Sequence, residues 1–574
     1  MTVYDPPLAT IRATLNAMAP GIAELPGCEA ADPETVGAVF EEAARFAREV
    51  LAPLNAVGDK APSRLENGVV RTPPGTQAAY RGFVEGGWNS LPFPEQWGGQ
   101  ALPATVAIAV GEMWNSADLA FSLCPLLTAA AVEALDRHGS PEQQRIYLPH
   151  LVSGNWTGTM NLTEPQAGSD VGAVRTRAEP DGDRWRITGQ KIFITYGDHD
   201  LAENVIHLVL ARTPGAPAGT RGISMFLVPK FLPDAEGRPG ERNDLRVVSL
   251  EHKLGIHASP TAVMSYGDNG GAIGFLVGAE NRGMENMFTM MNTARLHVGL
   301  QGIALSERAY QAARDYARNR VQGRPLVAAG EGPHPIVWHP DVRRMLLQMK
   351  STTEAARGLA YYAAGQADRA HHAPDETARQ AAQLRLDLLI PLVKAWGTDL
   401  AVENSSLAMQ IHGGMGFIEE TGVAQHYRDA RILPIYEGTN GIQAMDLVGR
   451  KLSRDRGAAV RAFVEEMQED AETLPLAERL YRALDLLEDA TKAVETFFAE
   501  SPALAAAASV PYLTLFAATA GFWVLLRLAR AAEDAPAQFE TARFFADHVL
   551  TRAEAGLGAI RGARTVVEFE PELL

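Results

Sequence analysis

A single carboxylate, Glu437, lies in the segment PIYEGTNGIQ, directly between a tyrosine and a glycine. An apolar Ile-Leu-Pro-Ile run precedes it, and a Gly-Thr-Asn-Gly sequence follows it. A carboxylate that is withdrawn from water becomes a stronger base, because desolvation disfavours its charged form. Most glutamates, however, are solvated surface residues. The segment alone therefore allows either a general base in an apolar pocket or an ordinary exposed glutamate.

Two earlier segments carry hydroxyl groups that could bind a flat heteroaromatic ring or a phosphate. The turn-rich segment MNLTEPQAGSD contains Thr163 and Ser169, and hydroxyls and loop N–H groups suit such ligands. In GQKIFIT, Phe193 and Thr195 are predicted to share one face of a strand, because side chains alternate along a strand. The alternatives are a capped turn and an ordinary strand pair, and neither is excluded by spacing.

Two later segments could hold a dinucleotide without a classical nucleotide-binding motif. In NRVQGRPL, Arg320 and Arg324 could clamp a pyrophosphate, or they could simply be solvated at a helix C-terminus. In MQIHGGMGF, Gly413 and Gly414 follow Gln410 and a histidine. Paired glycines let a backbone approach a ligand closely, although a helix C-cap uses glycine in the same way. The histidine alone is more typical of a core residue than of a catalyst.

Composition limits the classes of function that these residues can serve. The chain has 574 residues, too many for one core, so several domains are expected. Its formal net charge of -17 argues against general affinity for nucleic acid or for an acidic membrane surface. The two cysteines, Cys28 and Cys124, provide neither a disulfide framework nor metal-ligand spacing. Together with an N-terminus that lacks signal-peptide features, they lead us to expect a cytoplasmic protein without a bound metal.

The elements that must position these residues follow the order helix, strand, helix. Helical periodicity begins near Val36 and continues to about residue 151. Short β-branched or apolar runs bounded by Gly, Pro and Asp then fill roughly residues 157–278. A proline-free periodic segment over 284–320 predicts one long core helix, and helices continue to the end of the chain. There is no βαβ alternation, no Rossmann glycine motif after a strand and no P-loop.

One uncharged stretch, residues 503–526, is long enough to span a membrane. It is rich in Ala, Ser, Thr and Gly, Pro511 interrupts it, and dense charge follows it. We predict a buried helix within a helical bundle. A membrane-facing patch is the alternative interpretation.

Taken together, the segments NLTEPQAGSD, GQKIFIT, KLGIHASPT, MQIHGGMGF and PIYEGTNGIQ resemble the acyl-CoA dehydrogenase family in their order and separation. The resemblance covers about residues 36–452. It implies a mainly α fold with a middle β-barrel: an N-terminal extension (1–35), a helical domain (36–156), a β-domain (157–282) and a four-helix bundle (283–452). The remaining helical extension (453–574) resembles that of the long-form members. Among these, the chain is most similar to the bacterial enzymes that act on 3-methylmercaptopropionyl-CoA.

The resemblance implies that Glu437 is the general base of an acyl-CoA dehydrogenation. The base removes the α proton of the thioester, a hydride passes from the β carbon to N5 of FAD, and a trans-2-enoyl-CoA results. Some members carry their base on the long helix, and the matching position here is Ala294. Alanine cannot accept a proton, so Glu437 has no rival in the family pattern.

The same resemblance implies contacts with cofactor and substrate. The FAD contacts are Leu162, Thr163, Phe193, Thr195, Arg320, Gln322, Gln410, Gly413, Gly414 and Thr439. The expected substrate contacts are Ser169 for CoA, Arg295 near the thioester, and Gly438 in the turn after the base. Relatives usually have Phe-Gly after the Arg-x-Gln/Thr pattern that holds Arg320 and Gln322, and RVQGRP departs from this. In the family the pyrophosphate and adenosine contacts act across a subunit interface, which implies an oligomer, and the long form implies a homodimer.

Three functions stay open from the sequence. A dehydrogenase would pass electrons to electron-transfer flavoprotein, and this is the function we favour. An acyl-CoA oxidase would use the same base with oxygen as acceptor. A DNA-associated flavoprotein would act as a binding module, although the acidic balance and the presence of Glu437 speak against it. Short to medium acyl-CoAs, including the thioether, are the expected substrates, and the pathway, such as fatty acid β-oxidation, is not determined by these motifs.

Overall fold

The computed structural model describes residues 4–234, 236–327, 332–532 and 534–573. The chain divides into two compact units that do not follow the linear order of the sequence. Unit 1 comprises Met1–Arg48, Pro103–Ser116 and Arg295–Leu574, and unit 2 comprises Glu49–Leu102 and Ala117–Ala294. The N-terminal helical region is therefore shared between them.

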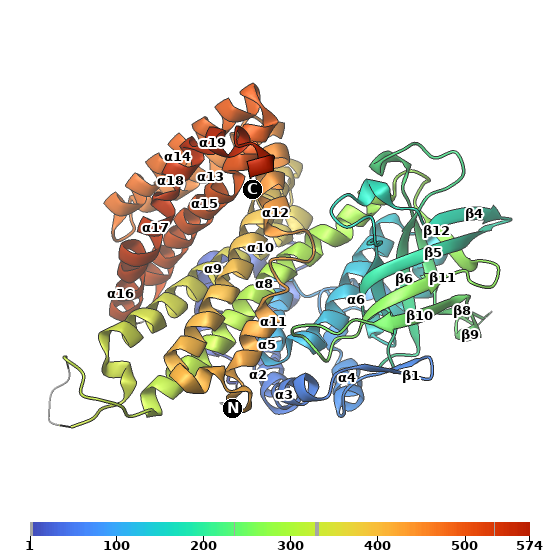
Figure 1. Cartoon of the computed structure of the whole chain (residues 1–574), viewed down its shortest axis with the longest axis horizontal. Helices are drawn as coiled ribbons and strands as arrows, with labels where there is room; N and C mark the ends of the chain where they lie inside the picture. The colour runs from blue at the N-terminus through green and yellow to red at the C-terminus, as the bar shows by residue number, and fades with distance from the viewer. Residues whose placement is uncertain (1–3, 235, 328–331, 533, 574) are drawn as a thin grey trace. The chain divides into compact units, whose positions relative to one another are not determined.

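Unit 2 is built on an eight-stranded sheet that curls as half a barrel (Figure 1). The strand order is β10-β11-β5-β12-β7-β6-β3, with β4 paired to β5, and only β3 and β6 run parallel. The strands are β3 (Trp156–Asn161), β4 (Arg177–Asp181), β5 (Arg184–Thr195), β6 (Asn204–Ala211), β7 (Ser224–Pro229), β10 (Leu245–Leu250), β11 (Thr261–Tyr266) and β12 (Ala272–Val277). Two small hairpins accompany it, β1 (Arg64–Glu66) with β2 (Val69–Arg71) and β8 (Phe231–Pro233) with β9 (Pro239–Arg242).

Every residue of β6 and of β7 is buried, so the middle of the sheet is covered on both faces. One apolar cluster joins these strands to the helices α6 (Leu119–His138) and α7 (Pro141–Ser153), and a second lies on the other face. The helices α3 (Ala52–Lys60) and α4 (Thr76–Glu85) complete the unit. Local signals fix these helices: the Asp118 carboxylate accepts from the Phe121 N–H to cap α6, and Ser140 and Gln143 form a capping box on α7.

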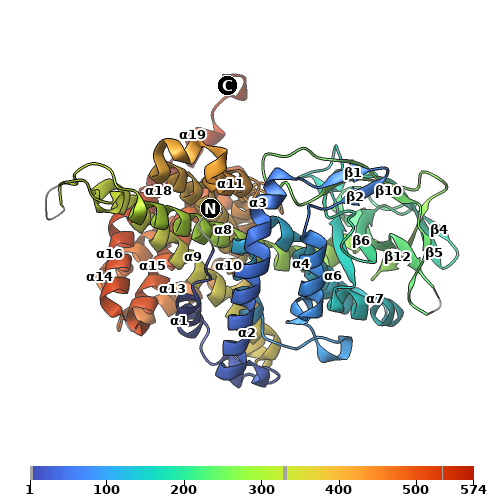
Figure 2. The same ribbon diagram turned by 90° about the horizontal axis from the view of Figure 1, so that it is seen from below.

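Unit 1 is helical, and most of it is a bundle of long helices (Figure 2). The predicted long helix is confirmed as α8 (Gly283–Asn319), of which the part from Arg295 belongs to this unit. It is accompanied by α9 (Pro340–His372), α10 (Glu376–His412), α11 (Val423–Ala430) and α12 (Asn440–Asp446). The first part of the chain adds α1 (Leu8–Met18), α2 (Pro33–Phe46) and most of α5 (Ala104–Ala117).

Glycines let α8 and α10 approach closely. A Cβ added to Gly302 would lie 2.2 Å from the carbonyl oxygen of Gly397, and one added to Gly299 would lie 2.6 Å from Val393. No side chain fits at those distances, so the two backbones are in direct contact. This crossing brings Arg295 of α8 and Lys394 of α10 into the same region of the unit.

The extra helices after residue 452 surround one apolar helix. They are α13 (Ala458–Ala471), α14 (Ala477–Glu500), α15 (Pro502–Ala531), α16 (Ala535–Phe545), α17 (Thr551–Glu554), α18 (Gly556–Arg561) and α19 (Ala563–Val567). The uncharged stretch predicted as a buried helix is α15, which packs against α14, α16 and α9 (Figure 1). In the described chain, α6 and α15 are long and apolar enough to cross a membrane, but 72% and 83% of their apolar windows are buried inside the protein. Core helices of soluble proteins show the same properties.

Candidate active site

Glu437 occupies a strained turn between α11 and α12. It is half-buried, its φ is +57°, and the following Gly438 has a φ of +82°. Glycine adopts left-handed backbone freely, but a glutamate there is uncommon and costs energy. Such outliers persist where the surrounding structure imposes them, and they concentrate at functional sites.

Side chains on α12 hold this turn in place. The Thr439 hydroxyl caps α12 by accepting from the Ile442 N–H at 3.3 Å, and Gln443 Nε2 donates to the carbonyl oxygen of Glu437 at 3.2 Å. The amide N–H of Asn440 donates to the carbonyl of Pro434 at 3.0 Å, which closes the loop. Among the described residues, the amide N–H of Glu437 itself has no acceptor.

Two cations lie near the carboxylate of Glu437. Burial raises the pKa of Glu437, while the charges of Arg295 and Lys394 act in the opposite direction. Arg295 on α8 is 3% exposed and its Nη1 lies 3.6 Å from Oδ2 of Asp446. Burial lowers the pKa of Arg295, and Glu437 and Asp446 oppose that effect. The structure thus places Arg295 as a buried cation in the same region as Glu437, and its predicted contact with the substrate stays a prediction.

Lys394 is a site residue that the sequence analysis missed. It is fully buried on α10, and its Nζ donates to the carbonyl oxygen of Gly438 at 2.8 Å and to Oδ1 of Asn440 at 2.9 Å. A signal was present in the sequence, because this lysine stands alone in the apolar run LLIPLVKAW, where a charge is unexpected. Its partners, however, lie more than 40 residues away, so periodicity could not reveal them.

In unit 2, a buried ion pair supports the loop that carries Leu162 and Thr163. Lys191 Nζ lies 2.8 Å from Oε1 of Glu164 and donates to the carbonyl oxygen of Leu162 at 2.9 Å. The Ile192 N–H donates to the carbonyl of Thr163 at 2.9 Å. The TEPQAGSD loop is thus tied to strand β5. Lys191 was not among the predicted site residues. It bonds to the carbonyl oxygen of Leu162 in this loop, just as Lys394 bonds to the carbonyl oxygen of Gly438 in the Glu437 turn.

Phe193 and Thr195 lie at the end of β5, but simple strand alternation does not place them. The pairing of β5 with β11 contains a bulge at this point, and Phe193 has a φ of +59°. Lys191 and Ile194 are both buried although they are three positions apart, whereas an unbroken strand would bury every second residue. The predicted regular alternation of side chains therefore does not hold at Phe193 and Thr195. Phe193 is 59% exposed, so a strained strand end presents an aromatic ring at the surface of the unit.

The remaining predicted residues lie on exposed backbone. Ser169 is exposed in the loop after Thr163 in unit 2. In unit 1, the C-terminal ends of α8 and α10 pack around one apolar cluster, and Tyr316 stacks on His412 with ring centroids 4.1 Å apart. The exposed residues at these ends are Arg320, Gln322, Gln410, Gly413 and Gly414. His412 is buried and its Nδ1 lies 2.7 Å from the carbonyl of Ala408, as expected of a core histidine.

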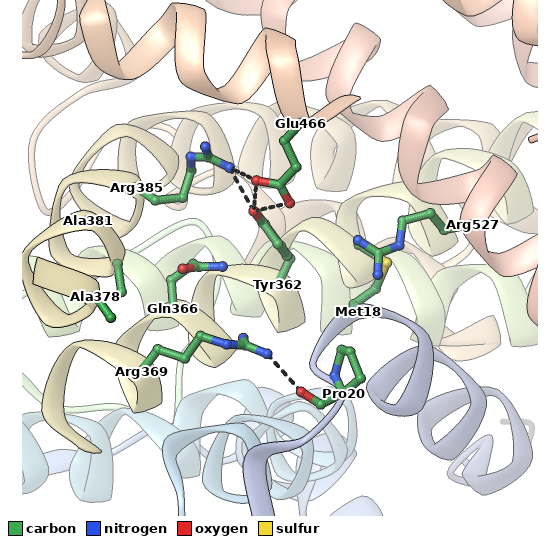
Figure 3. A pocket seen from close by; sticks show the side chains of 11 residues that line it. Met18, Pro20, Tyr362, Gln366, Arg369, Ala378, Ala381, Arg385, Glu466 and Arg527 are labelled. Atoms are coloured by element: carbon green, nitrogen blue, oxygen red, sulfur yellow. Dashed lines mark hydrogen bonds and ion pairs between the residues drawn. The ribbon is translucent and has the colours of Figure 1, made fainter. Parts of the chain in front are cut away.

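A cavity of about 470 Å³ in unit 1 contains none of the predicted residues (Figure 3). Tyr362, Arg385 and Glu466 line it and bond to one another, and the Arg369 guanidinium donates to the carbonyl oxygen of Pro20 at 2.7 Å. These polar groups already bond to one another, whereas burial raises the pKa of Glu437, so this cavity is the weaker candidate site. A second hollow of about 570 Å³ lies in unit 2 beside His257.

Comparison with known proteins supplies the family. Four family descriptions match successive stretches: "Acyl-CoA dehydrogenase, N-terminal domain" (33–155), its "middle domain" (159–268), its "C-terminal domain" (281–452), and "Acetyl-CoA dehydrogenase C-terminal like" (457–570). The chain is also 51% identical over 537 residues to the 3-methylmercaptopropionyl-CoA dehydrogenase of Ruegeria pomeroyi, covering 90% of this chain and 91% of that protein. The chain belongs to the acyl-CoA dehydrogenase family. The predicted fold class, with its extra C-terminal domain, is confirmed.

Two further acyl-CoA dehydrogenases show how far the likeness extends. The butyryl-CoA dehydrogenase of Syntrophomonas wolfei is 39% identical and covers 74% of this chain and 71% of its own. An acyl-CoA dehydrogenase structure from Bacillus anthracis, complexed with FAD, has a TM-score of 0.76 at 20% identity and covers 96% of this chain and 91% of that one. The latter is a likeness of fold, and it includes the extra helices after residue 452.

Proposed function

We propose that this chain catalyses the FAD-dependent α,β-dehydrogenation of a saturated acyl-CoA to its trans-2-enoyl-CoA, with Glu437 as the base. The observation that supports it best is the Glu437 turn itself. A carboxylate with a raised pKa is held in left-handed backbone beside two buried cations, within a family match that covers this segment. A solvated surface glutamate would have none of these features.

The residues of the turn suit proton abstraction next to a thioester. As a carboxylate with a raised pKa, Glu437 is a stronger base than a solvated glutamate and takes the α proton more readily. Its amide N–H, which has no acceptor among the described residues, is available to the thioester oxygen, where negative charge develops. Arg295 adds a positive charge near the carboxylate of Glu437. In this proposal, Glu437 alone both removes the α proton, through its carboxylate, and stabilises the developing negative charge, through its amide N–H.

The described residues fit FAD as the cofactor. A Cβ added to Gly413 or Gly414 would meet no atom within 4 Å, so this backbone is open to a ligand. Arg320 and Gln322 are exposed just after α8, whose C-terminal part shares an apolar cluster with that of α10. In unit 2, the exposed Phe193 ring suits a flat heteroaromatic partner. The proposed contacts are those that the family resemblance implies: Leu162, Thr163, Phe193, Thr195, Arg320, Gln322, Gln410, Gly413, Gly414 and Thr439. When bound, FAD would supply the hydride acceptor.

The proposed substrate is a short to medium acyl-CoA, with 3-methylmercaptopropionyl-CoA first among those to test. The support is the 51% identity to an enzyme of that name, which exceeds the 39% identity to a butyryl-CoA dehydrogenase. A panel of acyl-CoAs from butyryl to palmitoyl, together with the thioether, should be assayed with purified protein and a ferrocenium acceptor. Activity confined to palmitoyl-CoA and longer chains would contradict the substrate proposal, and no activity with any acyl-CoA would contradict the reaction.

We propose electron-transfer flavoprotein as the electron acceptor. The support is the similarity to proteins named dehydrogenases, which cover 90%, 74% and 76% of this chain. The alternative, an acyl-CoA oxidase, uses the same base and differs in its reaction with oxygen. Stoichiometric hydrogen peroxide formation during turnover in air would identify the oxidase. A slow reaction with air and rapid reduction of added electron-transfer flavoprotein would support the dehydrogenase.

We also propose that the chain forms a homodimer in the cytoplasm. The exposed cofactor residues of unit 1 are accompanied by large exposed apolar side chains: Leu326, Trp338, Met415, Phe417 and Ile418. Apolar groups gathered around ligand-binding backbone are typical of a surface that another subunit covers. Light scattering of a detergent-free preparation tests this, and a monomer or a tetramer would contradict it.

A further inference from the structure

Lys394 is an ammonium group in an apolar environment. It is fully buried in the middle of α10, and its neighbours Leu392, Val393 and Ala395 are at most 2% exposed. Burying a charged group costs free energy unless partners compensate, so lysines are almost never fully buried unless they are paired. Because Lys394 lies next to the crossing of α8 and α10, its ammonium group is not in contact with solvent water and depends on protein atoms for hydrogen bonds.

The partners of Lys394 are uncharged atoms of the Glu437 turn. Its Nζ bonds to the carbonyl oxygen of Gly438 at 2.8 Å and to Oδ1 of Asn440 at 2.9 Å. One of these residues immediately follows Glu437 and the other is the first residue of α12. The ammonium therefore holds the turn to α10 at the point where the backbone leaves its left-handed conformation. Asn440 is anchored to α10 a second time, since its Nδ2 donates to the Ala395 carbonyl and to Asp399 Oδ1 at 3.0 and 2.7 Å.

The turn needs such an anchor because its conformation is unfavourable. Left-handed backbone at Glu437 persists only if the contacts around it outweigh its cost. A direct bond from a buried ammonium to the neighbouring carbonyl is strong, because charge-assisted hydrogen bonds gain in an apolar environment. Without it, the turn could relax and the Glu437 carboxylate would move with it.

We propose that Lys394 is a positioning residue for the general base: it fixes the strained Glu437–Gly438 turn and supplies a positive charge that tunes the carboxylate. The proposal rests on the proposed function, because it assigns Lys394 a role through Glu437. The lysine itself does not contact the reacting atoms.

The charge of Lys394 gives the proposal a pH signature. Burial lowers the pKa of Lys394 to about 7, while Glu437 and Asp399 favour its charged form and Arg295 disfavours it. In turn, the charge of Lys394 lowers the pKa of Glu437. Removing that charge should therefore raise the pKa of Glu437, and the acid limb of the rate profile should move to higher pH. A residue that only supported the fold would not move this limb.

The test compares Lys394→Met with the wild type and with Lys451→Met. The control removes a lysine of the same unit, which pairs instead with Asp387 at 3.3 Å. The measurements are FAD content, thermal stability, affinity for the acyl-CoA, and the pH profile of anaerobic flavin reduction. Solvent deuterium uptake at the α carbon, followed on protein whose flavin has been reduced chemically, reports the base without hydride transfer. Should Lys394→Met fail to fold, Lys394→Gln replaces it, because the amide retains a donor but not the charge.

We expect Lys394→Met to lower both flavin reduction and α-carbon exchange by about 10- to 100-fold, since misplacing a catalytic group by ~1 Å costs about 100-fold. Affinity for the acyl-CoA should change less than about twofold, the acid limb should move to higher pH, and Lys451→Met should match the wild type. Unchanged exchange and an unmoved limb would overturn the proposal, as would a loss fully explained by lost FAD. If Glu437→Gln abolishes exchange while Lys394→Met does not, only this inference fails. If Glu437→Gln retains exchange, the proposed function itself fails.

Discussion

Substituting glutamine for Glu437 separates the chemistry of the site from its stability. The amide keeps the shape of the side chain but cannot accept a proton at neutral pH. Because the pKa of Glu437 is raised in the folded protein, the surroundings favour the neutral form. The charged carboxylate therefore costs stability at pH 7, and this cost disappears below the pKa of the unfolded chain. Glu437→Gln should melt at the same or a higher temperature than the wild type at pH 7, with the difference vanishing towards pH 4.

In contrast to its small effect on stability, Glu437→Gln should strongly lower the rate at which substrate reduces the flavin. A positioned general base contributes about 10²–10⁴-fold, which corresponds to about 3–5.5 kcal/mol of activation free energy. Two carboxylates that bond to residues around the turn already have partners of their own, because Asp399 accepts from Asn440 at 2.7 Å and Asp446 pairs with Arg295 and Arg450. Neither can substitute for the missing base. The loss in Glu437→Gln should therefore reach at least the lower end of that range.

Anaerobic stopped-flow bleaching of the flavin by substrate measures this loss directly. Glu469→Gln is the matched control, since Glu469 is exposed on α13 in the same unit and undergoes the same change of atoms. FAD content and substrate affinity should be equal in the three proteins. If Glu437→Gln bleaches within a few-fold of the wild type, Glu437 is not the base and the reasoning from burial and strain is refuted.

Three further predictions concern the same elements. The rate of flavin reduction in the wild type should rise with pH through the pKa of Glu437. The acid limb of this pH profile should therefore lie above the ordinary glutamate pKa of 4.5. An acid limb at or below that value would contradict the raised pKa. Gly438→Ala should lower the free energy of unfolding by about 1–2 kcal/mol, because φ is +82° and the new Cβ would lie 3.0 Å from Gln443 Nε2. Thermal or denaturant unfolding measures this, and an unchanged free energy of unfolding would show that the turn tolerates a side chain. Phe417→Glu should shift light scattering towards a monomer with loss of FAD, because Phe417 is 83% exposed beside the cofactor residues; an unaffected dimer would place the interface elsewhere.

Much of the architecture was determined by local sequence. The long proline-free periodic segment predicted α8 to within a residue at each end, and the β-branched runs bounded by Gly, Pro and Asp predicted the position of the sheet. Helical periodicity and strand composition report how a segment meets its immediate surroundings, so they need no knowledge of distant residues. The composition of the 503–526 stretch likewise predicted a buried helix, now α15. Glu437 itself came from a motif, because the order and spacing of several segments identified the family.

Other features were decided only by the tertiary structure. No local pattern could show that Lys394 bonds to Gly438, or that Lys191 supports the loop at Leu162, because each contact joins segments that are far apart in the chain. The left-handed backbone of Glu437 and the bulge at Phe193 run against the preferences of those residue types, so only the surrounding contacts could impose them. The sequence thus identified the carboxylate, but its raised pKa, its strain and its cations result from three helices that converge on one turn.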